Sequence, residues 1–266
     1  MSGLISRVVV SLVALPVVLG VVWLGGWWLF ALVAGAAIVA LHEYTSMTRQ
    51  LRPLLLGGYI GALAMLLGAS RGGLEWLLGG FMLALAVTFV LHLLAETRQP
   101  ATVAMGATLL GVAWIGFGLG HLVLLRDTDD GRLGLFTVLI AVFAADTVAY
   151  FAGRLFGRHK LAPTTSPGKT WEGFVAGSAA AVAAAFFALY EDRETYLTIP
   201  EALGLGAVVA LAAALGDLFE SAVKRDMQVK DTGRLLGGHG GVLDRIDSLL
   251  WAGPAAFYLL LAYGHA

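Results

Sequence analysis

The chain has no cysteine and very little charge. Its 266 residues include 17 Lys and Arg and 18 Asp and Glu, so only 13% are charged. Soluble globular chains average about 25% charged residues. The absence of cysteine excludes disulfides, thiolate catalysis and zinc sites with cysteine ligands. The scarcity of charge excludes an ordinary soluble enzyme, a disordered chain and a protein that binds nucleic acid through a basic face, so no nucleic-acid partner is expected.

Apolar residues are abundant instead, at 59%, and the chain has 35 glycines. A membrane-spanning helix needs roughly 20 apolar residues, and small residues let such helices pack closely in lipid. Nine segments meet or nearly meet that length: 8–25, 27–43, 54–70, 74–94, 102–125, 134–153, 172–190, 202–222 and 249–263. The sequence therefore predicts an all-α polytopic membrane protein with about nine transmembrane helices. We expect one integral membrane domain, 1–266, with N-terminal helices in 1–125 and the candidate catalytic helices and loops in 126–266.

The basic residues predict which side of the membrane each loop occupies, because Lys and Arg accumulate in cytoplasmic loops. With the N-terminus inside, thirteen of the 17 cations fall on the inner side and four on the outer side. An inner N-terminus and an outer C-terminus are therefore predicted. Two inner loops, 154–171 and 221–248, together hold nine of the 17 cations. We expect the chemistry of the protein to lie in these two loops.

Two pairs of carboxylates flank the second of these loops. Asp217 and Glu220 lie three residues apart near the end of one span, and Asp244 and Asp247 have the same spacing where the last span begins. Residues at this spacing share one face of a helix. Carboxylate oxygens suit Mg²⁺ better than zinc. Salt bridges at helix ends could explain any single one of these residues, but the whole set favours a metal site.

A glycine-rich segment, residues 237–241, lies between the two pairs and centres on His239. Glycine lets a backbone approach a ligand closely and turn its amides toward an anion. Basic side chains stand on both sides of the segment: Lys224, Arg225, Lys230 and Arg245. The combination favours polyphosphate binding, although His239 could also be a capping or packing residue.

The first inner loop contains a second candidate anion site. Ser166, Lys169 and Thr170 come just before an apolar stretch, and a helix N-terminus beside a lysine is a natural phosphate site. Thr170 could equally be a simple N-cap. Asp146 lies inside the sixth predicted span, where a carboxylate is a functional candidate by default. The pair at 42–43, His-Glu, ends the second span and could be functional or structural.

The run from Ser221 to Asp247 resembles the signature of the phosphatidate cytidylyltransferases, also called CDP-diacylglycerol synthases. The positions that carry the resemblance are Ser221, Lys224, Arg225, Lys230, Asp231, Gly233, Leu236, Gly237, Gly238, His239, Gly240, Gly241, Asp244, Arg245 and Asp247. The segment 166–173 is similar to a second motif of that family, with Gly168 where the family usually has lysine. The N-terminal half is similar to the family mainly in hydropathy.

The resemblance implies a transfer of the cytidylyl group of CTP to phosphatidic acid, which gives CDP-diacylglycerol and pyrophosphate. It implies a requirement for Mg²⁺, a further monovalent cation (K⁺) near it, and a homodimer. We expect an integral protein of the bacterial inner (plasma) membrane, in contact with membrane lipid, whose active site lies on the cytoplasmic face.

On this hypothesis the candidate residues receive three kinds of role. The metal ligands would be Asp217, Asp244 and Asp247, supported by Glu220 and Asp146. The catalytic residues would be Lys224, Arg225, Lys230, Asp231, His239 and Arg245. The substrate-binding residues would be Ser166, Lys169, Thr170, Ser221, Gly240 and Gly241. No general base is expected, because the attacking phosphate is already ionised.

The same residues allow other functions. A CDP-alcohol phosphotransferase needs a motif that starts with Asp-Gly, and that dipeptide occurs here at 130–131, in a predicted outer loop. The functions of a related lipid cytidylyltransferase and of a polyprenol or phytol kinase stay open as alternatives. Substrate assays would distinguish them from transfer to phosphatidic acid. An ion-coupled transporter would use Asp146 and the pair at 42–43 along a path through the midplane. The cations concentrate on one side instead, which favours catalysis.

Overall fold

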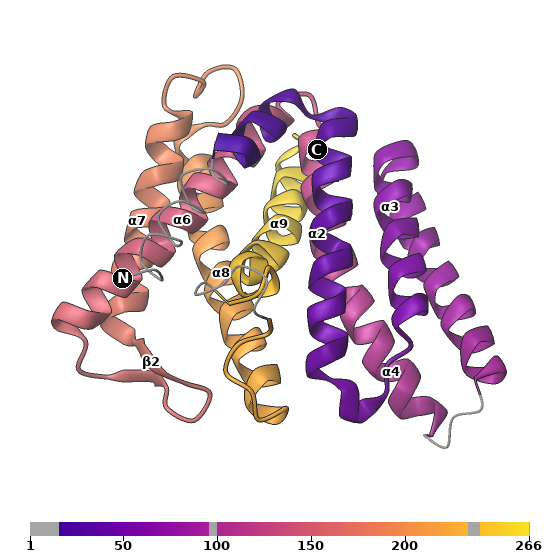
Figure 1. Ribbon diagram of the computed structural model, residues 1–266. Coiled ribbons are helices and arrows are strands. Elements are labelled where there is room, and N and C mark those ends of the chain that lie inside the picture. The colour runs from indigo at the N-terminus through magenta and orange to yellow at the C-terminus, as the bar shows by residue number, and fades with distance from the viewer. Residues whose placement is uncertain (1–15, 96–99, 234–239, 266) are drawn as a thin grey trace. The chain divides into compact units, whose positions relative to one another are not determined.

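The computed structural model describes residues 16–95, 100–233 and 240–265, and this part of the chain is mainly helical. Seven of its helices are long and apolar enough to cross a membrane: α2 (Gly26–Met47), α3 (Leu55–Leu94), α4 to α5 (Ala101–Arg126), α6 (Gly131–Phe156), α7 (Trp171–Leu189), α8 (Ile199–Asp226) and α9 (Leu243–Tyr263) (Figure 1). Residues 16–24, the described end of the first predicted span, are helical too. The prediction of a helical polytopic membrane protein is therefore confirmed.

Helix α3 contains two of the predicted spans. Its backbone breaks at Gly73, where φ is 73° and ψ is −155°. The two arms on either side of this break pack against each other. A Cβ placed on Gly61 would lie 2.5 Å from the Cβ of Ala84, and one on Gly57 would lie 3.0 Å from the Thr88 hydroxyl. Glycines on one arm thus allow the close approach of the other, so the 40-residue helix is an antiparallel helical hairpin.

The segment 101–126 is interrupted in a milder way. Helix α4 (Ala101–Gly111) passes through a short π-helix, η2 (Val112–Gly116), into α5 (Phe117–Arg126). A 3₁₀ turn, η1 (Arg49–Leu51), follows α2. The Tyr44 hydroxyl of α2 is buried and donates a hydrogen bond of 2.8 Å to the carbonyl of Ala107 in α4.

The structure corrects the extent of the second predicted inner loop, 221–248. Helix α8 continues to Asp226, and α9 already begins at Leu243. Lys224, Asp244 and Asp247 lie on these helices, in agreement with their helical spacing in the sequence. Only the bounds of the loop change, because hydropathy does not detect helical turns that carry polar residues beyond the apolar band.

The first inner loop contains a short antiparallel hairpin that the all-helical prediction did not include. Strands β1 (Lys160–Ala162) and β2 (Ser166–Thr170) pair Lys160 with Thr170 and Ala162 with Ser166. The hairpin joins α6 to α7. It places Lys169 and Thr170 directly before the first residue of α7.

The chain divides into two compact units. The N-terminal unit comprises Met1–Asp127 and Met227–Ile246, and the C-terminal unit comprises Thr128–Asp226 and Asp247–Ala266. Each contains helices long enough to span a membrane, so the division does not separate a soluble part from a membrane part. The single integral membrane domain stays a prediction.

Large apolar side chains cover much of the surface of these helices. Trp28 is 65% exposed, Leu155 71% and Phe187 75%. A soluble protein rarely leaves such extensive apolar surface open to water. The exposed apolar surface is what lipid contact requires.

Candidate functional site

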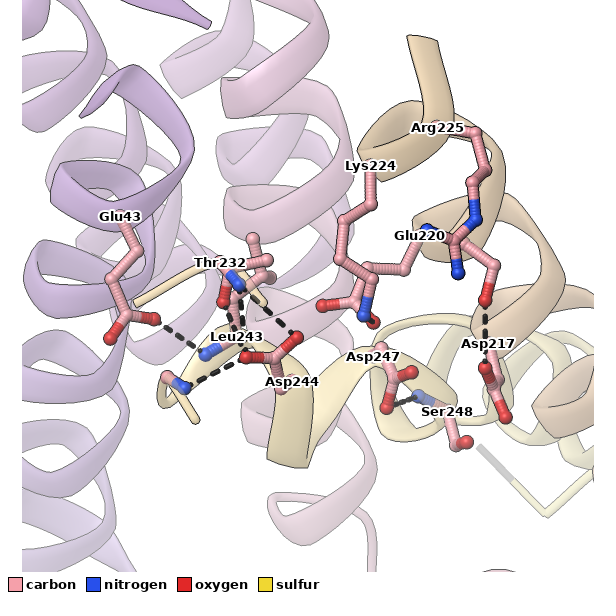
Figure 2. Close-up of polar contacts among 12 residues, drawn as sticks. Glu43, Asp217, Glu220, Lys224, Arg225, Thr232, Leu243, Asp244, Asp247 and Ser248 are labelled. Atoms are coloured by element: carbon pink, nitrogen blue, oxygen red, sulfur yellow. Dashed lines mark hydrogen bonds and ion pairs between the residues drawn. The ribbon is translucent and has the colours of Figure 1, made fainter. Parts of the chain in front are cut away.

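Three carboxylates converge in the C-terminal unit. Asp217 and Glu220 come from α8 and Asp247 comes from the first turns of α9, and each offers an oxygen within 4.8 Å of the others (Figure 2). Glu220 is 1% exposed and Asp247 8%. These three residues are called the acidic cluster below. Like charges at this separation repel one another, and burial strengthens the repulsion.

Two lysines partly neutralise the acidic cluster. Lys169 Nζ lies 2.7 Å from Asp217 Oδ2, and Lys224 Nζ lies 2.7 Å from Glu220 Oε2. Ser221 Oγ donates a hydrogen bond of 3.3 Å to Asp217 Oδ1. The structure thus brings together Lys169, from the hairpin before α7, and Lys224, from α8, around carboxylates from two helices.

The close approach of α8 and α9 builds this cluster. A Cβ on Gly216 would lie 2.5 Å from the carbonyl oxygen of Asp247 and 3.0 Å from Trp251 Cδ1, so no larger residue fits between the two backbones. The Phe219 and Trp251 rings pack beside it, with centroids 5.5 Å apart. Van der Waals contacts at this crossing stabilise the close approach of the two helices.

The β1–β2 hairpin holds the other predicted anion-binding residues. Thr170 caps α7, because its Oγ1 accepts a hydrogen bond of 3.1 Å from the Gly173 amide. This N-cap contact explains the presence of Thr170 at this position without any bound ligand. Arg225 Nε donates to the carbonyl of Thr165, at 3.3 Å, and so joins the end of α8 to the hairpin. Ser166 is paired within the hairpin.

Asp146 lies beside the acidic cluster without being one of its three members. It is on α6, interacts electrostatically with Asp217 and Lys169, and hydrogen-bonds the side chain of Ser248. The residue is exposed on the single chain. Its predicted role as a supporting ligand stays a prediction.

Asp244 has different partners from the acidic cluster. In the N-terminal unit its Oδ2 accepts hydrogen bonds from the Thr232 amide (3.1 Å), the Thr232 hydroxyl (2.9 Å) and the Gly241 amide (2.7 Å) (Figure 2). The sequence pattern predicts Asp244 and Asp247 together as metal ligands. The described hydrogen bonds show that Asp244 joins Thr232 to Gly241. Its role as a metal ligand stays a prediction.

Glu43, for which the sequence allows a functional or a structural role, makes buried polar contacts. It is 6% exposed and accepts hydrogen bonds from the Val242 amide (3.0 Å) and the Leu243 amide (2.9 Å). The available signal was a carboxylate at the end of an apolar span. Sequence spacing could not reveal the partner, because it lies 200 residues further along the chain.

The remaining predicted residues lie on the surface or outside the described part. Lys230, Asp231 and Arg245 are exposed. Gly240 has a positive φ of 83°. His239, with residues 234–238, lies outside the described residues.

The acidic cluster fits a divalent metal ion of the magnesium type. Its potential ligands are all carboxylate oxygens, which Mg²⁺ and Ca²⁺ prefer. Two of the three carboxylates are buried, and buried charges of one sign require a compensating cation. Zinc sites draw mainly on imidazole and thiolate ligands, which this cluster lacks.

The chain is similar to known proteins of one family over most of its length. A model described as the cytidylyltransferase family matches residues 5–263. The phosphatidate cytidylyltransferase of Brucella abortus is 36% identical over 270 residues, which cover 97% of this chain and 93% of that protein. The phosphatidate cytidylyltransferase of Haemophilus influenzae is 34% identical over 95% of this chain and 97% of its own length. That of Mycobacterium bovis is 35% identical over 86% of this chain and 79% of its own.

Proposed function

The chain belongs to the cytidylyltransferase family, and we propose that it transfers a cytidylyl group from CTP to phosphatidic acid. The products are CDP-diacylglycerol and pyrophosphate. The observation that carries this proposal is the acidic cluster of Asp217, Glu220 and Asp247, bordered by Lys169 and Lys224, in a membrane protein similar over nearly its whole length to phosphatidate cytidylyltransferases.

The reaction forms one bond and breaks one. A phosphate oxygen of phosphatidic acid attacks the α-phosphorus of CTP, and the bond between the α-phosphorus and the bridging oxygen breaks as pyrophosphate leaves. Both reactants are anions. The protein must therefore offset their repulsion and stabilise the charge on the leaving group. Because the attacking phosphate is already ionised, no side chain has to remove a proton.

We assign Mg²⁺ to Asp217, Glu220 and Asp247. Asp146 is a supporting ligand and Asp244 a further candidate, with K⁺ as the monovalent cation nearby. When bound, the metal supplies positive charge to the transferred phosphoryl group and the leaving pyrophosphate.

The lysines beside the acidic cluster have a second task in this proposal. In the described structure Lys169 and Lys224 neutralise carboxylates. A metal ion bound by those carboxylates would compete with the lysines, so each ammonium group becomes available to a phosphate oxygen of CTP or of the lipid. Arg225, Lys230, Asp231, His239 and Arg245 complete the predicted catalytic set, and Ser166, Thr170, Ser221, Gly240 and Gly241 the substrate-binding set.

The proposed topology has nine transmembrane helices, an inner N-terminus and an outer C-terminus. The two arms of α3 account for two crossings, and residues 16–24 belong to the first predicted span. The excess of Lys and Arg in inner loops supports the orientation. We place the protein in a bacterial inner membrane, as a homodimer with its active site on the cytoplasmic face.

The proposal is tested with purified protein in detergent, labelled CTP, phosphatidic acid and MgCl₂. We expect CDP-lipid and pyrophosphate in equal amounts, none without lipid, and none after the divalent metal is chelated. A parallel series replaces phosphatidic acid with polyprenol, phytol or an ether-linked phosphatidic acid. Formation of CDP and a phosphorylated alcohol would identify a kinase instead, and absence of CDP-lipid above the lipid-free control would contradict the proposal.

A further inference from the structure

A buried carboxylate in the N-terminal unit takes no part in the reaction described above. Glu43, near the end of α2, is 6% exposed, and its two oxygens accept hydrogen bonds from the amides of Val242 and Leu243. Leu243 is the first residue of α9 and Val242 precedes it. The first amides of a helix have no partner within the helix, and the helix dipole places partial positive charge there. Glu43 therefore caps α9 from a distant helix.

The backbone next to these amides is shaped around the Glu43 carboxylate. A Cβ on Gly233 would lie 2.5 Å from Glu43 Oε1. A Cβ on Gly241 would collide with Glu43 Oε2 and would lie 2.5 Å from the Thr232 hydroxyl. Only glycine leaves enough room at these two positions. Two glycines of the signature therefore make space for a carboxylate of the protein itself.

Asp244 holds the same two stretches of chain to each other. It accepts hydrogen bonds from the amide and the hydroxyl of Thr232 and from the amide of Gly241. Glu43 and Asp244 thus connect residues 232–233, residues 240–243 and the end of α2. These contacts are called the carboxylate clasp. All of its residues belong to the N-terminal unit.

We propose that Glu43 is a positioning residue for cytidylyl transfer, which acts through the backbone of residues 241–243 and sets the placement of the neighbouring residues Lys230, Asp231 and Arg245. It does not touch substrate. Lys230 and Asp231 come directly before the clasp, and Arg245 follows Asp244 on α9. Because these are predicted catalytic residues, the inference rests on the proposed function, and loss of Glu43 weakens the productive binding of CTP.

The test compares Glu43→Gln with two other variants. Glutamine keeps the shape but removes the charge and turns an NH₂ donor toward a backbone donor. Gly233→Ala disturbs the same contact from the other side. Tyr44→Phe is the matched control, because it removes a buried hydrogen bond of the neighbouring residue, 2.8 Å to Ala107, without contact to the clasp. For each variant we would measure kcat, KM for CTP, KM for phosphatidic acid, thermal unfolding and amide exchange at Val242 and Leu243.

A hydrogen bond to a charged group is worth enough to predict a loss on the order of 10-fold to 100-fold in kcat/KM for CTP in Glu43→Gln. KM for phosphatidic acid stays unchanged, and the Val242 and Leu243 amides lose their protection. Gly233→Ala gives the same pattern, and the double variant is no worse than the poorer single one, because both changes break one contact.

Three results would overturn the inference. They are normal kinetics for CTP in a folded Glu43→Gln protein, an equal loss for Glu43→Gln and Tyr44→Phe that follows thermal stability, and additive losses in the double variant. The exchange measurement does not depend on the reaction. A failure of the proposed function, seen as absence of CDP-lipid with the unmodified protein, is therefore separate from a failure of the clasp.

Discussion

The acidic cluster of Asp217, Glu220 and Asp247 lowers the stability of the fold, because its carboxylates repel one another. Three carboxylates lie within 4.8 Å of one another, and two of them are buried. Lys169 and Lys224 offset part of this charge. Removal of one acid relieves repulsion while it removes a proposed metal ligand, so stability and activity should respond in opposite directions.

This opposition gives a prediction for Asp247→Asn. Cytidylyl transfer should fall about 100-fold or more, because a metal ion contributes several kcal/mol to such a transition state. Thermal stability in detergent should stay the same or rise. The measurements are CDP-lipid formation across a range of MgCl₂ concentrations and an unfolding curve for the same sample. Near-normal transfer at low MgCl₂ would contradict the assignment of Asp247 to the metal.

Lys224 should matter for folding as well as for catalysis. Its partner Glu220 is 1% exposed, so a lysine-to-methionine change leaves a buried charge without this cation. Breaking such a buried pair typically costs about 3–5 kcal/mol. We expect Lys224→Met to lower the unfolding temperature and Lys224→Met/Glu220→Gln to recover much of it, while both stay inactive. The pair would be shown unimportant for stability if the single variant unfolded at the same temperature as the unmodified protein.

At the scale of elements, the crossing of α8 and α9 decides whether the acidic cluster forms. Gly216 lets the α8 backbone approach the carbonyl of Asp247. Phe219 and Trp251 pack beside this contact. Helix positions in a membrane protein depend on such small-residue contacts, because lipid provides little hydrophobic force between helices.

Gly216→Ala therefore tests the crossing. The added methyl would lie 2.5 Å from the Asp247 carbonyl oxygen and must push the helices apart. We expect a stability loss of about 1–3 kcal/mol, typical of overpacking, and a larger loss of activity. Gly204→Ala is the control on the same helix, since its methyl would meet the flexible end of Tyr263, at 2.6 Å from the hydroxyl. Equal activity of the two variants would show that the crossing does not control the site.

At the scale of the whole molecule, two features stand out: the exposed apolar surface of its helices and the uneven distribution of cations among its predicted loops. The predicted inner loops hold most of the cations, and both of the proposed site's lysines come from them. A reaction between a soluble nucleotide and a lipid headgroup needs this placement, because one substrate comes from water and the other stays in the membrane.

The absence of cysteine makes the topology directly testable. Single cysteines at Asp129 and Glu194 should react with a membrane-impermeant maleimide in intact cells, because both lie in predicted outer loops. Cysteines at Thr164 and Gln228 should react after the membrane is opened. All four positions are exposed in the structure. The reverse labelling pattern would overturn the proposed orientation.

Hydropathy predicts the class of protein, a mainly helical membrane protein, from the sequence alone. A chain in lipid must satisfy its backbone hydrogen bonds within each span, so apolar length alone identifies helices. The spacing of Asp217 and Glu220, and the position of Asp247 at the start of a span, pointed to a site for a hard cation. Spacing could not separate Asp247 from Asp244, because both fit the same helical face.

Contacts between segments that are distant in the sequence distinguish the surroundings of Asp247 from those of Asp244. Asp247 meets α8, whereas Asp244 meets Thr232 and Gly241. Glu43 reaches an amide 200 residues away, and Thr170 is occupied as a cap by an amide three residues on. The positions of the scarce charges along the chain predict which two segments carry the chemistry. The tertiary structure decides which charged side chains face one another, because this depends on how closely two backbones approach. Glycines such as Gly216 allow that approach, and the residues they contact are distant in the sequence.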